Sequence, residues 1–171
     1  MAEATTHTKI FVTSDQHFDH ENIIKYCNRP FRSVEEMNNT LLNNWNSSVS
    51  NDDTVYFLGD LAFGRGSRST NYWLKQLKGK IIFIKGSHDK SKNIEFLQYI
   101  KFQYGKYLFF LTHDPAHAPK NWHGWIIHGH YHNHKPEYSF INKEKRTVNV
   151  CVELTNYKPV DINDIIKNIN Q

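Results

Sequence analysis

Short apolar runs that end in histidine or aspartate recur along this sequence, and this pattern constrains the fold more than any other feature. Each run has the length and composition of a buried β-strand. In open α/β sheets, ligands bind beyond the carboxyl ends of the strands, so polar side chains placed there are expected to meet in one crater. The runs are residues 9–14 before Asp15 and His17, 54–58 before Gly59 and Asp60, 81–84 before His88 and Asp89, 108–112 before His113, and 125–127 before His130 and His132.

The chain length predicts a single domain over residues 1–171, of which residues 1–8 form a flexible N-terminus without a secretory signal. No apolar run approaches the roughly 20 residues that a membrane-spanning helix requires, so no membrane partner is expected. Cys27 and Cys151 lack the spacing of a metal site. They are typical of reduced thiols in a cytoplasmic protein, with a disulfide as the alternative.

The formal net charge of +4 and the isoelectric point of about 9.0 only weakly favour an anionic substrate or partner. The basic residues are scattered along the chain, which predicts a solvated basic surface rather than a dedicated nucleic-acid groove. A nucleic-acid partner is therefore an alternative without support in the sequence, and the sequence sets no oligomeric state.

Strands and helices alternate in the first half of the chain, whereas the second half consists mainly of strands. This order predicts an α/β sandwich with two sheets in the middle and helices outside. Ser33 to Glu36 have the form of a capping box at the start of a helix. The other expected elements are helices at 21–27, 69–77 (with Tyr72, Trp73 and Leu77 inward), 93–99 and 161–169, a hairpin over 102–104 and 107–111, and a half-exposed strand over 147–154.

Two histidine-containing pairs are spaced like metal ligands. Asp15 and His17 are two residues apart, as are His130 and His132. On an extended backbone, side chains at this spacing point the same way, so each pair could hold one cation. Carboxylate combined with imidazole suits Mn, Fe, Ni or Zn better than Ca. Each pair alone is a weak signal, but all the strand-end motifs in one chain are a strong one.

The ordered motifs resemble those of the calcineurin-like metallophosphoesterase superfamily, over about residues 9 to 154. The short length, residues 22–31 and the stretch 59–64 are similar to the small prokaryotic and viral members. The resemblance implies a four-layer α/β/β/α sandwich of two mixed sheets flanked by helices. The motifs that carry it are Asp15-x-His17, Gly59-Asp60, Gly86-Ser87-His88-Asp89, His113 and Gly129-His130-x-His132.

The resemblance also implies two divalent metal ions and a role for each matching residue. A hydroxide that bridges the ions would attack the phosphorus of a phosphate ester. The implied ligands are Asp15, His17, Asp60 and His132 for the first ion and His113, His130 and residue 87 for the second, with Asp60 shared by both, His88 as the catalytic imidazole and Asp89 as the residue that orients it.

Ser87 is the departure from the family pattern, which has asparagine at this position. A serine hydroxyl is shorter and a poorer ligand, so Ser87 could ligate through a water or could leave the second metal site weak or vacant. It could also be an engineered substitution. The expected function is metal-dependent hydrolysis of phosphate esters, chiefly phosphodiesters of nucleotides or related small molecules. The alternatives are an inactive binding or scaffold module with the same fold, and a nuclease.

Three further residues are candidates for contact with the substrate phosphate, namely His20, Asn22 and Arg29. For His20 and Arg29 a structural role is an open alternative. His20 could simply begin the helix that follows it. Arg29 could pair with a buried carboxylate, because such pairing is common for arginine.

Overall fold

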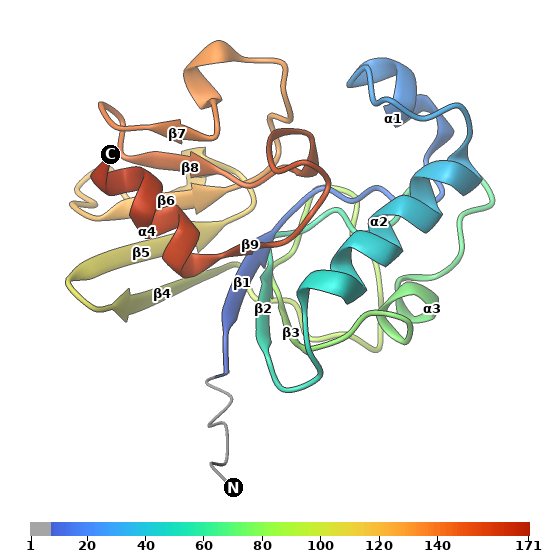
Figure 1. The fold of residues 1–171 in the computed structure, drawn as a ribbon, viewed down its shortest axis with the longest axis horizontal. Coiled ribbons are helices and arrows are strands. Elements are labelled where there is room, and N and C mark those ends of the chain that lie inside the picture. The colour runs from blue at the N-terminus through green and yellow to red at the C-terminus, as the bar shows by residue number, and fades with distance from the viewer. Residues whose placement is uncertain (1–7) are drawn as a thin grey trace, which may run out of the picture.

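Two β-sheets form the middle of the molecule, and helices flank them (Figure 1). The computed structural model describes residues 8–171. The flexible N-terminus expected over residues 1–8 lies, apart from Thr8, outside the described residues. Both sheets contain parallel and antiparallel pairs, which confirms the predicted α/β sandwich of two mixed sheets flanked by helices.

The first sheet places the ends of three successive strands at one edge. Its order is β3 (Lys80–Phe83), β2 (Thr54–Phe57), β1 (Ile10–Thr13) and β9 (Val160–Asp161). Strands β1, β2 and β3 are parallel, whereas β9 runs antiparallel to β1. Parallel strands have their carboxyl ends on the same side, so the loops after β1, β2 and β3 lie next to one another.

The second sheet adds two more such loops. Its order is β4 (Tyr99–Tyr104), β5 (Tyr107–Thr112), β6 (Trp125–His128), β8 (Thr147–Asn149) and β7 (Ile141–Asn142). The predicted hairpin is confirmed as the antiparallel pair β4 and β5. Strands β5, β6 and β8 are parallel, so the loops after β5 and β6 leave the same edge of this sheet.

Four α-helices and three short 3-10 helices complete the described chain. Ser33 accepts a hydrogen bond from the backbone N–H of Glu36 at 3.1 Å and so begins α2, as the capping motif predicts. Asp161 caps α4 in the same way through the N–H of Asn163 at 2.9 Å. The helices are α1 (Glu21–Tyr26), α2 (Val34–Ser48), α3 (Thr70–Leu74) and α4 (Ile162–Asn170), and the 3-10 helices are η1 (Pro115–His117), η2 (Pro136–Tyr138) and η3 (Val152–Leu154).

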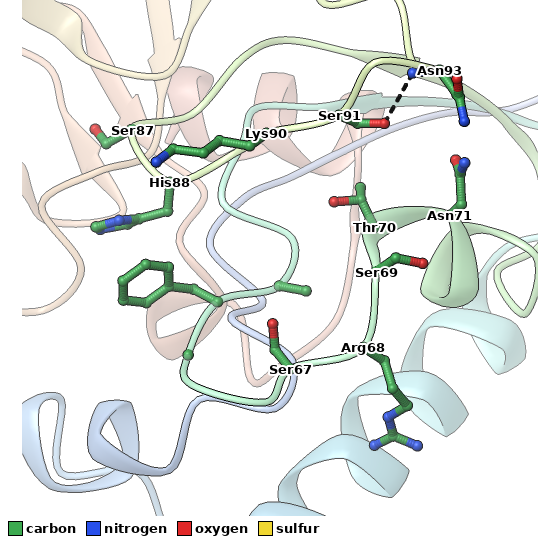
Figure 2. Close-up of a pocket in the computed structure, with 13 residues that line it drawn as sticks. Ser67, Arg68, Ser69, Thr70, Asn71, Ser87, His88, Lys90, Ser91 and Asn93 are labelled. Atoms are coloured by element: carbon green, nitrogen blue, oxygen red, sulfur yellow. Dashed lines mark hydrogen bonds between the residues drawn. The ribbon is translucent and has the colours of Figure 1, made fainter.

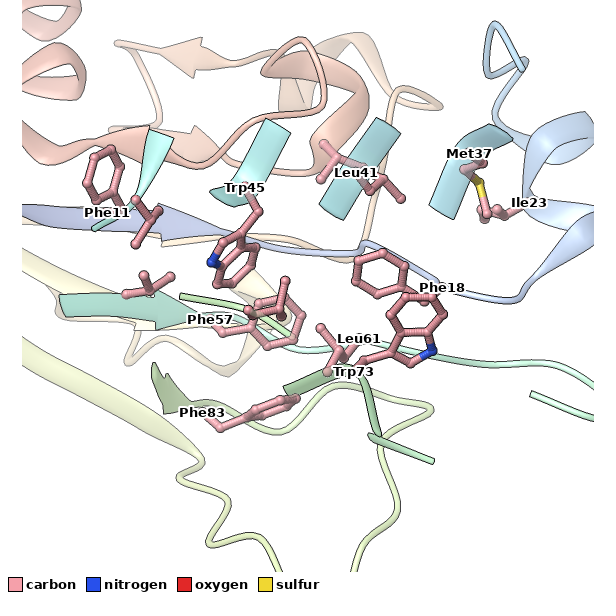
Figure 3. Packing of buried hydrophobic residues seen from close by; sticks show 14 of the residues in the cluster. Phe11, Phe18, Ile23, Met37, Leu41, Trp45, Phe57, Leu61, Trp73 and Phe83 are labelled. Carbon is pink, nitrogen blue, oxygen red and sulfur yellow. The ribbon is translucent and has the colours of Figure 1, made fainter. Parts of the chain in front are cut away.

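Two apolar clusters hold these layers together. In the first, Trp45 of α2 and Trp73 of α3 pack with Phe57 of β2 (Figure 3). The second joins both sheets and α4, with Leu58 after β2, Leu111 of β5, Ile127 of β6, and Ile162 and Ile165 of α4. Trp45 and Trp73 are 1% and 3% exposed, and the other side chains named here are fully buried. The clusters therefore fix the sheets relative to each other and leave their strand ends aligned.

The structure contradicts three of the expected elements. Residues 93–99 form no helix; Leu97 instead bridges Ile84, and Tyr99 already belongs to β4. The expected half-exposed strand over 147–154 is wrong, because β8 ends at Asn149 and the segment continues buried into η3. The helix expected at 69–77 is shorter, and Tyr72 is 43% exposed rather than inward.

The sequence also predicts reduced cysteines and no membrane-spanning helix. Cys27 and Cys151 are both free and buried. Over residues 8–171, no helix combines the length and the apolar character needed to cross a membrane.

Candidate metal centre

Loops from both sheets meet at one place in the molecule. The backbone N–H of His130, after β6, donates to Oδ2 of Asp15, after β1, at 3.0 Å. Nε2 of His113, after β5, lies 3.5 Å from Oδ2 of Asp60, after β2. The strand ends of two sheets therefore converge on one cluster of carboxylates and imidazoles, as the strand-end pattern predicts.

The backbone in these loops is left-handed rather than extended. The φ angles are 62° at Asp15, 51° at His17, 60° at Asp60, 73° at His130 and 48° at His132. Few residues other than glycine adopt this region, and such strain tends to gather at functional sites. The extended backbone expected for the Asp15–His17 and His130–His132 pairs is therefore wrong, although the side chains within the first pair do meet.

One group of ligand atoms surrounds Oδ1 of Asp15. Nε2 of His17 lies 3.7 Å from this oxygen and Nε2 of His132 lies 3.5 Å from it. Two atoms that each bind one ion at about 2.1 Å with a tetrahedral angle lie roughly 3.4 Å apart. The spacing of Asp15, His17 and His132 therefore fits a single cation between them.

Buried atoms without partners support this fit. Oδ1 of Asp15 and both ring nitrogens of His17 are buried and have no hydrogen-bond partner among the described residues. An unpaired buried polar atom costs about 1–3 kcal/mol, so native proteins rarely leave several together. A divalent cation would satisfy Asp15 Oδ1 and His17 Nε2 at once.

A second group of ligand atoms surrounds Oδ2 of Asp60. This oxygen also lies near His17 of the first group. Oδ2 of Asp60 lies 3.7 Å from Nε2 of His17 and 3.5 Å from Nε2 of His113. Nδ1 of His130 is 3.3 Å from Nε2 of His113. The other oxygen of Asp60 accepts from the backbone N–H of His88 at 2.8 Å. Oδ2 is thus the atom of Asp60 that both ligand groups can share.

Hydrogen bonds set the tautomers of two of these histidines. Nδ1 of His113 lies 2.8 Å from the carbonyl oxygen of Leu58, which can only accept, so this nitrogen carries the proton. Nδ1 of His132 donates in the same way to Oε1 of Glu153 at 3.0 Å. Both rings therefore turn the Nε2 atom towards the centre. A partner on the far ring nitrogen is the usual support of a metal-binding histidine.

Arg29 has a different position from the one expected of a substrate ligand. It is only 4% exposed and its guanidinium bonds Oε1 of Glu153 at 2.6 and 2.9 Å. It also donates to the carbonyl oxygens of Asp15 and Gln16, each at 2.8 Å. Because these partners occupy the guanidinium, Arg29 supports the Asp15 loop and Glu153, which corrects its assignment to the substrate phosphate.

Charges inside the centre shift the pKa values of its members. Burial raises the pKa of Asp15, but the neighbouring His132, His17 and His113 outweigh this and hold it well below its usual range. Burial lowers the pKa of His132, yet Asp15 and Glu153 raise it to about 11. Burial, followed by the charge of His113, lowers the pKa of His130. Asp15 thus remains charged, as a metal ligand must.

His88 lies at the exposed rim of the centre. Its ring contacts that of Phe63, with 4.0 Å between centroids, and meets the ring of His17 edge-on at 5.8 Å. Asp89 was expected to orient His88, but its carboxylate accepts from three backbone N–H groups instead. These belong to Asp60 at 2.7 Å, Gly86 at 2.8 Å and Leu61 at 3.2 Å. Asp89 therefore ties the loop after β3 to the loop after β2.

The remaining predicted residues are Ser87, His20 and Asn22. Ser87 is exposed, and its hydroxyl has no hydrogen bond within residues 8–171. His20 is half-buried, with its ring 5.5 Å from that of His17 and 4.9 Å from that of Phe63. Burial and the charge of His17 lower the pKa of His20 to about 4. Asn22 is exposed on α1 and has no hydrogen bond to the centre in the described chain.

Glu153 is the residue that sequence reasoning missed. It stands in η3, a segment expected to be a half-exposed strand, and no motif marks it. Burial raises the pKa of Glu153, but its hydrogen bond to His132 and the charges of Arg29 and His132 outweigh this and lower the pKa to about 2. The only signal in the sequence is a lone carboxylate in an apolar stretch, which is equally typical of a strand end at the protein surface.

A family model and one relative each match almost the whole chain. A family model described as calcineurin-like phosphoesterase matches residues 8–166. An uncharacterized protein of Methanocaldococcus jannaschii is 48% identical over 166 residues, which cover 95% of this chain and 92% of that protein.

Two further similarities have lower sequence identity. The gene 66 protein of Mycobacterium phage L5 is 37% identical over 79 residues, or 45% of this chain and 38% of that protein. The crystal structure of a protein of unknown function from Aquifex aeolicus superimposes with a TM-score of 0.72 at 26% identity. That match covers 95% of this chain and 100% of the Aquifex chain.

Proposed function

The chain belongs to the calcineurin-like phosphoesterase family, and from this premise we propose that it hydrolyses phosphate esters with the help of two divalent metal ions. The observation that carries the proposal is the position of Asp60 Oδ2 between His17 and His113. Mn, Fe, Ni or Zn suits this mixture of carboxylate and imidazole ligands. The preferred substrates are small phosphodiesters, including those of nucleotides, in the cytoplasm.

Each residue has a part in this proposal. Asp15, His17, Asp60 and His132 would hold one ion, and Asp60, His113 and His130 the other, with Ser87 at the position where the family has an asparagine ligand. When bound, the ions polarise the phosphoryl oxygens and supply a nucleophile from water at neutral pH.

His88 takes the remaining role in the reaction. Its backbone N–H is fixed by Asp60 and its ring is held against Phe63, so the imidazole lies at the open side of the centre. From there it donates a hydrogen bond or a proton to the leaving oxygen, a contribution of about 10²–10⁴-fold.

The test is hydrolysis of bis(4-nitrophenyl) phosphate with added Mn²⁺. We expect turnover by the natural chain, and we expect Asp60→Ala to reduce it to background because both ions lose a shared ligand. The matched control is Asp52→Ala, which removes an exposed carboxylate eight residues earlier in the chain. Full activity of Asp60→Ala would contradict a centre built on Asp60.

A second candidate function is a binding or scaffold module with the same fold. Ser87, exposed and without a bonded hydroxyl among residues 8–171, is the observation that favours it. Metal analysis separates the two, because about two ions per chain support the enzyme and none supports the module. Ser87→Asn restores the family's ligand type. If this variant also fails to hydrolyse bis(4-nitrophenyl) phosphate, the result would favour the module.

A further inference from the structure

A polar cavity of about 510 Å³ opens beside His88. Ser87 and His88 form its boundary with the centre, while the loop after β2 and the start of α3 form its opposite wall (Figure 2). Its volume lies within the range of about 300–1,000 Å³ that is typical of ligand sites. A group attached to a phosphate at the centre can therefore extend into it.

Groups that both donate and accept hydrogen bonds line this cavity. Such side chains match the hydroxyls of a polyol or sugar, which also donate and accept. The lining offers a ligand little apolar contact. Phe63 is the one phenylalanine, tyrosine or tryptophan among the lining residues, and its ring already lies against His88. The polar lining consists chiefly of the hydroxyls of Ser67, Ser69, Thr70 and Ser91 and the amides of Asn71 and Asn93.

The cavity also has an uncompensated positive charge. No carboxylate is among its lining residues, which include the cations Arg68 and Lys90. Arg68 is engaged, because it bonds Asp19 at 2.5 and 3.2 Å, and Figure 2 shows it pointing away from the cavity. Lys90 has no ion pair or hydrogen bond within the part of the chain that the structure describes, and it extends toward Ser87 and His88 (Figure 2).

We propose that this cavity binds a leaving group that carries hydroxyls and a second phosphate, that is, a sugar phosphate or a related phosphorylated polyol. The inference rests on the proposed phosphoesterase function. Lys90 binds the second phosphate, and the hydroxyl and amide groups bind the polyol. In such a reaction the oxygen of water joins the attacked phosphorus, and the bridging oxygen leaves with the sugar phosphate. Where the bridging oxygen belongs to a sugar hydroxyl, it leaves as an alcohol that takes up one proton of water, and the other proton is released as the new phosphate ionises. Where it belongs to the second phosphate, as in UDP-glucose, both protons of water are released as the two products ionise.

The experiment compares kcat/KM for two substrates with Mn²⁺ present. UDP-glucose has a leaving group with a phosphate and hydroxyls, whereas that of bis(4-nitrophenyl) phosphate has neither. In Lys90→Gln, we expect the ratio of kcat/KM for UDP-glucose to that for bis(4-nitrophenyl) phosphate to fall about 10- to 100-fold, the usual effect of a lost charge-assisted hydrogen bond. Lys92→Gln, an exposed neighbour outside the cavity with the same charge change, should leave the ratio unaltered.

Four outcomes would overturn the inference. Turnover of bis(4-nitrophenyl) phosphate without any turnover of UDP-glucose would refute the cavity's assignment and leave the proposed function intact. An unchanged ratio in Lys90→Gln, or an equal change in Lys92→Gln, would show that Lys90 does not recognise the second phosphate. Loss of turnover of both substrates by the natural chain and by Ser87→Asn would overturn the proposed function and this inference together.

Discussion

Glu153 shows how a single residue can control a metal centre that it does not enter. Its Oε1 accepts from Nδ1 of His132 at 3.0 Å and is held in turn by Arg29. This arrangement fixes the ring of His132 and aims Nε2 at Asp15. Such a carboxylate acts by positioning the ligand and by raising its basicity.

We therefore predict that Glu153→Gln weakens Mn²⁺ binding about 10- to 100-fold, as mutation of such supporting residues usually does. Isothermal titration calorimetry of the metal-free protein measures this directly. The matched control is Glu144→Gln, at an exposed position. A purely structural Glu153 would lower the melting temperature but leave the Mn²⁺ dissociation constant of the folded protein unchanged, which would refute its positioning role.

For single residues, the sequence predicts the metal ligands better than it predicts the residues that hold those ligands in place. Asp60, His113 and His132 were expected together because each follows a buried strand, and strand ends share an edge. The sequence predicts that Arg29 contacts the substrate and that Asp89 orients His88, yet in the structure Arg29 bonds backbone carbonyls and Asp89 accepts from backbone N–H groups. Contacts to backbone leave no mark in the sequence, because any residue offers the same partner groups.

At the level of elements, the loops after β2 and β3 pack without space between them. A Cβ added to Gly86 would collide with the backbone nitrogen and the carboxylate of Asp60. Only glycine therefore allows the β3 loop to approach the shared ligand so closely. The φ angle of Gly86 is not in the left-handed region, so the requirement is one of space.

We predict that Gly86→Ala displaces Asp60, lowers activity on bis(4-nitrophenyl) phosphate at least tenfold and destabilises the fold by about 1–3 kcal/mol. Kinetics and urea unfolding measure the two effects. Gly66→Ala is the control, because a Cβ there meets nothing within 4 Å and carries only the cost of φ +82°, about 1–2 kcal/mol. Equal activity losses in both variants would contradict a specific effect on Asp60.

Elements with strong local signals were predicted well, and those fixed by tertiary contacts were not. The capping serine at residue 33 and the apolar spacing of α2 are sufficient to define that helix. Residues 93–99 also suggest a helix, but Leu97 pairs with Ile84, and Ile94 and Phe96 pack against the first cluster instead. The short strand β9 was missed because its pairing with β1 depends on where the chain returns.

At the level of the whole molecule, the metal centre joins the two sheets. Asp15 and Asp60 come from the first sheet, and His113, His130 and His132 from the second. Ions bound between them would link the sheets in the folded state only, because the unfolded chain does not assemble these ligands. Metal binding should therefore stabilise the entire fold rather than one loop.

We predict that Mn²⁺ at about 100 times its dissociation constant stabilises the protein by about 2.7 kcal/mol, or roughly 5–10 °C in melting temperature for a chain of this size. Differential scanning calorimetry with and without Mn²⁺ measures the shift. Asp60→Ala should lose most of it, whereas Asp52→Ala should keep it. An equal shift in Asp60→Ala would place the bound Mn²⁺ elsewhere.

The pH dependence of this stabilisation follows from His132. Burial lowers the pKa of His132, but Asp15 and Glu153 raise it from 6.5 to about 11, so the metal-free protein holds a proton there at neutral pH. The stability from that proton is complete below pH 6.5 and is lost as the pH rises towards 11.

A bound ion must displace this proton, because Nε2 of His132 cannot bind metal while protonated. We therefore predict that Mn²⁺ affinity rises about tenfold per pH unit between roughly pH 6.5 and 8, with one proton released from His132. Calorimetric titrations in two buffers of different ionisation enthalpy count the released protons. In Glu153→Gln the rise should level off at a lower pH, because His132 loses one of the two carboxylates that raise its pKa. An affinity independent of pH would mean that His132 does not bind the ion.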